Sequence, residues 1–273
     1  MEWLHKKLAQ IAASAADKDL YLAFSAVPRY VGKAPLHLSS EQAAEAQSIR
    51  KGFDPTRWTA DQAARTLLLL ALPHENKEAF VARIETLFST ADMRELVALY
   101  AALPLLPYPE AFRMRAAEGF RTNMGNVFEA VAQDTPYPAD YLEEEAWNHM
   151  VLKTLFVGKP LYRIQGIDRR ANAKLAHILS DYAHERWAAG RPVSPELWRS
   201  VGPFIDDALL EDIKRLFAQP DLLQQEAAAL ACSQSTHPGA KALLEGHPQL
   251  KQKIESGELT WDLIGHQTLA LQS

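Results

Sequence analysis

The sequence predicts an all-α protein. Helical start and stop signals recur along the whole chain of 273 residues. No stretch alternates apolar and polar residues with the period of two that a half-buried strand requires, and β-branched residues are sparse. Leu36–Leu38 comes nearest to a strand and is too short to form one. These observations leave helices as the only regular element that we expect.

The expected helices are delimited by capping residues, prolines and glycines. At a helix start, a Ser or Thr side chain accepts a hydrogen bond from an otherwise unpaired backbone N–H, and a Gln three residues later reciprocates. The start signals of this kind, or with proline at the first helical position, are Ser39 with Gln42, Thr59 with Gln62, and Ser194 before Pro195. The glycines at expected helix ends are Gly190, Gly246 and Gly257.

The helices are expected in short pairs. The pairs are 59–72 with 77–88, 90–103 with 109–133, and 207–217 with 221–233. The last pair resembles a HEAT-type unit, because the small residues of QQEAAALAC let a second helix pack closely. A spacing of about 35–45 residues per pair is typical of helical repeats. We therefore predict an irregular α-solenoid of HEAT-like helical pairs, with a compact irregular helical bundle as the alternative.

We expect a single all-helical domain over 1–273. Residues 31–55 contain the most irregular connection, with Gly32, Pro35, Gly52 and Pro55, and are expected to be flexible. The hydrophobic fraction of 48% is enough for a large core.

Composition argues against several function classes. The formal net charge is −5, and no stripe of Lys and Arg is present, so nucleic acid is not an expected partner. The longest apolar run, Leu67–Leu72, is far too short to cross a bilayer, and the first residues lack the apolar segment of a signal peptide. We expect a soluble, cytoplasmic protein. Cys232, the only cysteine, lies in an apolar helix and is expected to be an inert buried thiol.

Polar side chains gather in three helical segments that otherwise have core character, Arg121–Glu129, Trp147–Lys153 and Asp168–Arg191. A polar group on an apolar stripe loses hydration unless it finds a partner or serves a ligand. We expect the three helices to share an inner surface. Asn126, His149 and Arg186 should then line a common recess.

The helix expected from Asn172 to Ala189 has an apolar stripe that continues into Arg186. This guanidinium should meet a carboxylate, backbone carbonyls or an anionic ligand. The adjacent face carries a set of imidazoles and carboxylates, namely His177, Asp181, His184 and Glu185. The set could bind a divalent metal, but a solvated polar face with local hydrogen bonds is favoured.

Two earlier helices carry the remaining polar candidates. Apolar residues nearly surround the helix over 147–156, so Asn148 and His149 are expected in or beside the interior. In a continuous helix over 109–133, Asn123 and Asn126 should flank the apolar stripe, with Gly125 between them. Such amides could bind a neutral polar ligand or bridge two helices.

Other catalytic motifs are missing. Asp206–Asp207 with Glu211–Asp212 has the residue types of a diphosphate-binding magnesium site, but it follows a proline at a helix start, where acids favour the positive end of the dipole. No glycine-rich phosphate loop, nucleophile elbow or Ser/His/Asp order occurs.

Long runs of the sequence are similar to the EboA-domain family. The runs are AWNHMVLKTLFVGKPL, DRRAN, DYAHERWAAGR and SPELWRSVGPFID, and later EAAALACSQSTHPGAKALL and SGELTWDLI. The similarity extends from about Thr59 onward and is densest between Asn123 and Asp206. It implies an all-helical accessory protein from bacterial gene clusters that move secondary metabolites or their precursors toward the periplasm.

The resemblance implies an accessory protein with no established catalytic residues. Together with the helical-repeat punctuation and the polar residues on three helices that form no catalytic constellation, it leads us to expect a non-enzymatic scaffold or binding protein without a cofactor or metal. Expected partners are proteins of the same cluster, among them a membrane prenyltransferase-like protein, and a small polar metabolite. Arg121 comes from the polar cluster above, and the other candidate ligand-binding residues match the family's motifs: Asn123, Asn126, Asn148, His149, Lys153, Arg169, Arg170, Asp181, His184, Glu185 and Arg186. The alternative is a metal-assisted hydrolase or isomerase in which His184 and Glu185 act as acid, base or ligand groups.

Overall fold

The computed structural model describes residues 2–13 and 17–272. In these ranges the regular structure is α-helix and short 3-10 helix without strands, so the predicted all-α class is confirmed. Leu36–Leu38 forms no strand, although the neighbouring Pro35 makes an isolated β-bridge to Thr59.

The chain divides into two compact units, Met1–Ala146 and Trp147–Ser273. The division falls inside one helix, α10 (Glu144–Phe156). The single domain expected over 1–273 stays a prediction.

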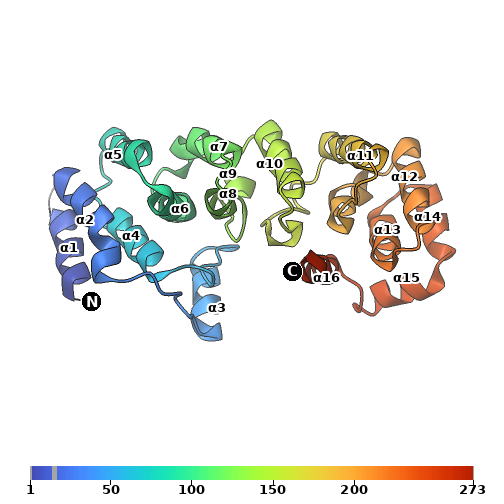
Figure 1. The fold of residues 1–273 in the computed structure, drawn as a ribbon, viewed down its shortest axis with the longest axis horizontal. Helices are drawn as coiled ribbons and strands as arrows, with labels where there is room; N and C mark the ends of the chain where they lie inside the picture. Colours follow the sequence, from blue (N-terminus) through green and yellow to red (C-terminus); the bar gives the residue numbers. More distant parts are fainter. Residues whose placement is uncertain (1, 14–16, 273) are drawn as a thin grey trace. The chain divides into compact units, whose positions relative to one another are not determined.

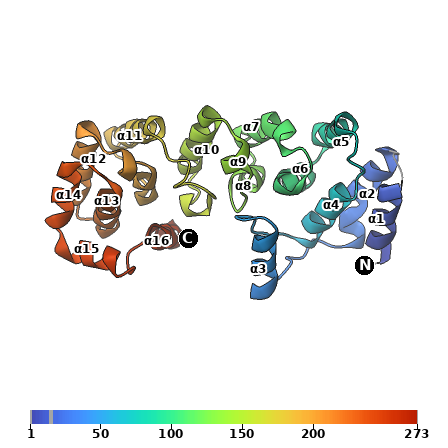
Figure 2. The ribbon, with the colours of Figure 1, turned by 180° about the vertical axis from the view of Figure 1, so that it is seen from behind.

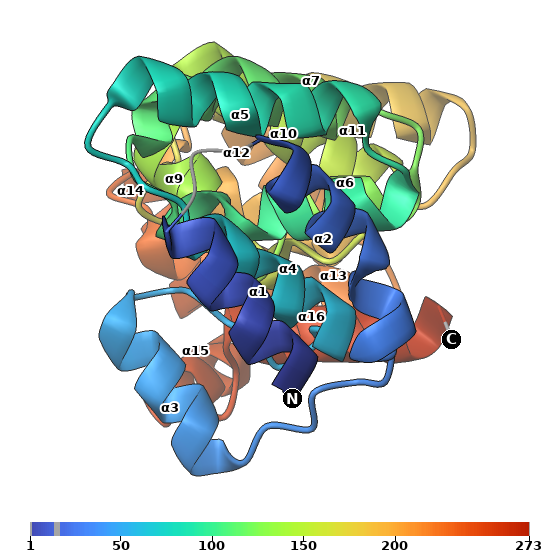
Figure 3. The ribbon, with the colours of Figure 1, turned by 90° about the vertical axis from the view of Figure 1, so that its left-hand side faces the viewer.

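The first unit is built around α6, because α4 and α8 both pack against it. At its amino-terminal side α1 and α2 lie against α4, as Figures 1 and 3 show from two directions. Its helices are α1 (Glu2–Ala13), α2 (Asp17–Tyr30), α3 (Ser40–Ile49), α4 (Ala60–Leu70), α5 (Lys77–Thr90), α6 (Met93–Ala102), η1 (Leu103–Leu105), η2 (Pro109–Phe112), α7 (Arg113–Arg121), α8 (Gly125–Ala132) and α9 (Tyr137–Tyr141).

A buried ion pair joins three helices of the first unit. Asp61 and Arg65 of α4 are 1% and 2% exposed, and Arg65 Nη1 lies 2.9 Å from Asp61 Oδ2. Arg94 of α6 donates to the other carboxylate oxygen at 2.7 Å, and Arg65 Nε donates to the carbonyl of Phe24 in α2 at 3.1 Å. Burial alone would raise the pKa of Asp61, but the hydrogen bonds from Arg94 and Thr59 outweigh it and hold that pKa below its ordinary value.

Two local predictions in the first unit are wrong. The Thr59 side chain makes no capping bond to the backbone, because its hydroxyl donates to Asp61 instead. The continuous helix expected over 109–133 is broken into η2, α7 and α8. The break comes at 122–124, where the Thr122 hydroxyl accepts the N–H of Met124 and Asn123 and Gly125 are poor helix formers.

Residues 31–55 are not wholly irregular. They contain α3, whose start has the predicted capping box between Ser39 and Gln42. The flexibility expected for this segment stays a prediction.

The second unit is organised around α13, the helix rich in small residues. The α12 helix, α14, η4 and η5 all pack against it, and Figure 2 shows α12, α13 and α14 together. From Trp147 onward its elements are α10, η3 (Leu161–Arg163), α11 (Ala173–Ala188), η4 (Pro195–Ser200), η5 (Gly202–Phe204), α12 (Asp207–Phe217), α13 (Leu222–Gln234), α14 (Pro238–Glu245), α15 (Pro248–Glu255) and α16 (Trp261–Gln272).

Small residues allow the close packing expected of α13. A Cβ placed on Gly202 would come within 2.8 Å of the Ala231 backbone, so η5 can approach α13 only with glycine at that position. The predicted pair over 207–217 and 221–233 corresponds to α12 and α13, which contact each other. The solenoid arrangement stays a prediction, and an irregular helical bundle is compatible with the same helices.

Candidate functional site

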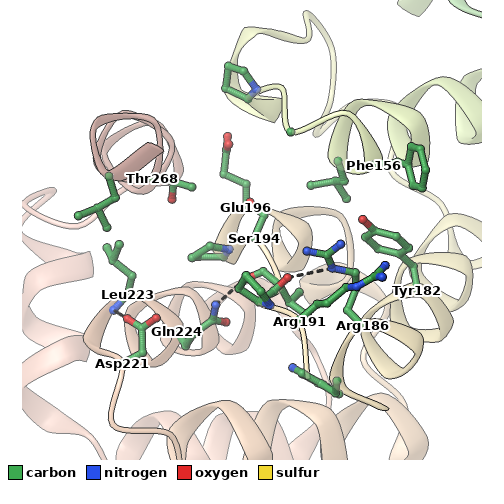
Figure 4. A pocket seen from close by; sticks show the side chains of 18 of the residues that line it. Phe156, Tyr182, Arg186, Arg191, Ser194, Glu196, Asp221, Leu223, Gln224 and Thr268 are labelled. Atoms are coloured by element: carbon green, nitrogen blue, oxygen red, sulfur yellow. Dashed lines mark hydrogen bonds between the residues drawn. The ribbon is translucent and has the colours of Figure 1, made fainter. Parts of the chain in front are cut away.

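The second unit contains a cavity of about 670 Å³, a volume within the range of small-molecule sites. Figure 4 shows Thr268 and Gln224 on one side of it and Tyr182, Arg186 and Arg191 on the other. The lining residues come from the end of α10 and the segment after it, the second half of α11, the segment 190–195, the start of η4, the start of α13 and the end of α16.

Two buried side chains in the cavity wall have unpaired polar atoms. Gln224 is 6% exposed, and its Nε2 donates to the carbonyl of Val193 at 2.7 Å, but its Oε1 has no hydrogen-bond partner. Thr268 is 9% exposed, and its Oγ1 has no partner either. A buried polar atom without a partner costs roughly 1–3 kcal/mol. A polar ligand in the cavity would remove this cost once a side-chain rotation turned the unpaired oxygen toward it.

Glu196 places a buried carboxylate in the same wall. It is 2% exposed and accepts the backbone N–H groups of Leu161 at 3.1 Å and Tyr162 at 2.7 Å. Burial outweighs these bonds and raises the pKa of Glu196 above its ordinary value. The carboxylate lies against α16 at Gly265, where a Cβ would come within 2.8 Å of Glu196 Oε1 and overlap the Tyr162 ring. Glycine at 265 therefore lets α16 pack closely against Glu196 and Tyr162.

Two arginines bring positive charge to the opposite wall. Arg186 Nε donates to the carbonyl of Pro192 at 3.0 Å, and its guanidinium carbon lies 6.0 Å from the centroid of the Tyr182 ring. Arg186 was predicted to need a carboxylate, backbone carbonyls or an anionic ligand as its partner, and the carbonyl of Pro192 is one such partner. Arg191 follows Gly190, whose φ of +65° ends the helical course, and its side chain is exposed at the cavity.

Arg186 is the predicted site residue that lines this cavity. Asn148 is buried as expected, but it pairs with Asn172, the residue that caps α11, through bonds of 3.2 and 2.9 Å in both directions. His149 is exposed, so its predicted place in or beside the interior is wrong. Successive residues of α10 point in different directions, and Trp147, Asn148 and Val151 occupy the buried face. Lys153 is half-buried, and desolvation lowers its pKa.

The other predicted residues of the second unit lie outside the cavity. Arg169, Asp181 and Glu185 are exposed, and the Arg170 guanidinium carbon lies 5.1 Å from the centroid of the Trp147 ring. His184 Nε2 lies 2.5 Å from Oδ1 of Asp212, a buried carboxylate that also accepts the hydroxyl of Ser180 at 2.6 Å.

The imidazoles of α11 do not form a metal site with their own helix. His177 pairs with Asp206, the residue that caps α12, and His184 pairs with Asp212 within α12. Across residues 2–13 and 17–272, no group of three or more His, Cys, Asp or Glu side chains is arranged to hold a metal ion.

Three predicted residues lie in the first unit. Arg121 ends α7, Asn123 lies in the link that follows, and Asn126 belongs to α8, and all three are exposed. The predicted recess shared by Asn126, His149 and Arg186 would combine residues of both units and stays a prediction.

Sequence reasoning did not select four of the residues that now define the site, Arg191, Glu196, Gln224 and Thr268. A weak signal exists for two of them. Gln224 precedes the alanine-rich core of α13, and Thr268 lies among the apolar residues of α16. No pattern in the sequence brings these two helices to one cavity.

The fold and the cavity define an all-α protein with a site of small-molecule size. The chain belongs to the EboA family, described as metabolite traffic protein EboA, whose family model matches residues 1–202. The match begins well before Thr59, from which the similarity was expected to extend. It ends before the two carboxy-terminal runs that also resemble the family.

No curated protein and no solved structure matches the chain. Among the helices of the described ranges, none combines the length and the apolar character needed to traverse a bilayer.

Proposed function

We propose that this protein binds a small polar metabolite in the cavity of its second unit and serves metabolite traffic as a binding protein without catalysing a reaction. Two unpaired buried atoms, Gln224 Oε1 and Thr268 Oγ1, carry this proposal. The side chains of Gln224 and Thr268 line one cavity from two helices. Because the two oxygens are themselves buried, a rotation of each side chain would bring its oxygen to a ligand that offers hydrogen bonds. The family's description supports metabolite traffic as the context.

The finer parts of the proposal follow the family resemblance. The metabolite would be a secondary metabolite or a precursor of one, carried in the cytoplasm on its way toward the periplasm. The protein partners would be encoded in the same gene cluster, with a membrane prenyltransferase-like protein as the candidate that receives the cargo.

Native mass spectrometry tests whether the cavity holds a ligand. The purified full-length protein is incubated with the desalted small-molecule fraction of the cells that express it, and the mass of the complex is compared with that of the protein alone. We expect a discrete added mass on the wild-type protein. The added mass should be lost in Leu223→Trp, because Leu223 lines the cavity and a larger side chain there would fill it.

A matched control is available one residue earlier. Leu222 is 71% exposed and does not line the cavity, so Leu222→Trp makes the same chemical change without filling it and should retain the added mass. A wild-type protein that acquires no added mass, or one that Leu223→Trp leaves unchanged, overturns the proposal. Conversion of the bound molecule to a product would instead support the hydrolase or isomerase alternative.

A further inference from the structure

We infer that the metabolite carries an anionic group, a phosphate or a carboxylate, which the guanidinium groups of Arg186 and Arg191 recognise. This inference rests on the proposed function and names the chemical class of its ligand. The other end of the ligand would offer an N–H or O–H donor to Gln224 Oε1 and a hydrogen bond to Thr268.

The first argument is the charge of the two arginines. Neither guanidinium has a carboxylate within ion-pair distance in the described part of the chain. The acidic residues of the cavity wall are already engaged, because Glu196 accepts two backbone N–H groups and Asp221 caps α13 through the N–H of Leu223. The positive charge of Arg186 and Arg191 is therefore available to a ligand.

The second argument is how the arginines are held. Arg186 Nε is bonded to the carbonyl of Pro192, and the Arg191 N–H donates to the carbonyl of Arg186 at 2.8 Å. These two bonds hold the segment after Gly190 against the end of α11. Arg191 belongs to this segment, and both bonds of the segment are made to Arg186. The bond to Pro192 orients the guanidinium of Arg186, and the backbone bond of Arg191 fixes the point from which its side chain extends. Planar guanidinium groups suit the oxygen atoms of phosphate and carboxylate.

The third argument is the distribution of polar groups around the cavity. Arginines lie on the wall formed by α11 and the segment after it, whereas Gln224 and Thr268 lie on the wall formed by α13 and α16 (Figure 4). A molecule that meets both walls needs negative charge toward the first wall and a hydrogen-bond donor toward the unpaired oxygen of Gln224. A hydroxylated acid or phosphate ester has both.

Three sugars that share the same ring and differ in charge test the ligand class. Glucose 6-phosphate, glucuronate and glucose are titrated into the full-length protein, and dissociation constants are measured by ligand-observed NMR. We expect one or both anions to bind at least about tenfold more tightly than glucose, which corresponds to a charge-assisted contact. The anion with the lower dissociation constant shows whether the site prefers a phosphate or a carboxylate.

The variant Arg191→Gln identifies the anion contact. It should remove most of the difference between the anions and glucose without lowering the melting temperature, because no side-chain bond of Arg191 supports the fold. The control Lys241→Gln makes the same change in net charge at an exposed residue of α14 outside the cavity and should leave the affinities unchanged.

The possible results separate the two proposals. If glucose binds as tightly as the anions and Leu223→Trp blocks it, the cavity is a ligand site but the anion inference is wrong. If neither anion binds, or if Arg191→Gln leaves the preference intact, the inference is also wrong. If the anions bind equally well to Leu223→Trp, they bind outside the cavity and both proposals lose their support.

Discussion

At Thr268 the proposed ligand binding and the stability of the fold can be tested separately. Its hydroxyl is buried in the wall of the cavity and has no hydrogen-bond partner, so the folded protein gains nothing from it in the absence of ligand. Valine has nearly the same shape without the hydroxyl. The same residue can therefore be tested for both effects.

We expect Thr268→Val to leave the free energy of unfolding unchanged or to raise it by about 1 kcal/mol. Urea denaturation of the ligand-free protein measures this change. In the native mass spectrometry experiment the same variant should retain less of the added mass than the wild type. A loss of stability well above 1 kcal/mol would mean that the hydroxyl has a partner in the folded protein.

Glu196 gives the second prediction at this scale, a pH dependence. Because burial raises the pKa of Glu196 above its ordinary value of 4.5, the folded protein holds this proton at a pH where the unfolded chain has released it. The folded state then binds more protons than the unfolded state, so the contribution of Glu196 to the free energy of unfolding falls as the pH rises from about 4.5 through the folded pKa.

Urea denaturation of the wild type and Glu196→Gln at several pH values checks this sign. The glutamine variant loses one acceptor for a backbone N–H and should be less stable at low pH. The stability of the wild type relative to the variant should decrease as the pH rises. An advantage of the wild type that grows with pH would contradict the raised pKa.

At the scale of the element, glycines show where helix packing is tight and where it is not. Gly119 of α7 faces Tyr100 and Val131, and a Cβ there would come within 2.6 Å of each. Gly125 at the start of α8 has no heavy atom within 4 Å of that position. Gly125 therefore serves no close approach between helices, whereas Gly119 does.

Gly125→Ala should therefore stabilise the protein by about 0.4–1 kcal/mol, because alanine reduces the entropy of the unfolded chain without a clash. Gly119→Ala is the matched control and should destabilise it, since Tyr100 and Val131 belong to the packed helices α6 and α8. Thermal unfolding of both variants measures the difference. Equal effects of the two substitutions would contradict this account of the packing.

At the scale of the whole molecule, the division into two units places the proposed binding residues together. All residues that line the cavity belong to the second unit, whereas the buried ion pair of Asp61 and Arg65 belongs to the first. Stability and binding can therefore be changed through different parts of the chain.

Asp61→Asn should lower the free energy of unfolding by roughly 3–5 kcal/mol, since it leaves the buried guanidinium of Arg65 with only the more distant carboxylate of Glu95, at 3.9 Å. The affinity of the cavity for its anionic probe should stay within about twofold of the wild type at temperatures where the variant remains folded. Calorimetry gives the first quantity and ligand-observed NMR the second. A large loss of affinity in the folded variant would show that binding depends on the first unit.

The helical class, several helix ends and the family of this protein could be predicted from the sequence. These depend on neighbouring residues, such as the capping box of Ser39 and Gln42, the glycine that follows α11 and the long runs shared with the family. It also identified Arg186 as an arginine in need of a partner. Local patterns of this kind can be read without knowing how the helices pack.

Which polar residues meet could not be predicted and depends on how the helices pack. Asn148, His184 and Asp181 carry the same kind of signal in the sequence as Arg186, yet the first two pair with Asn172 and Asp212 and the third is exposed. Gln224 and Thr268 reach one cavity because α13 and α16 pack in the same unit. Contacts between residues of different helices depend on the packing of whole helices, and no periodicity within one helix encodes that packing.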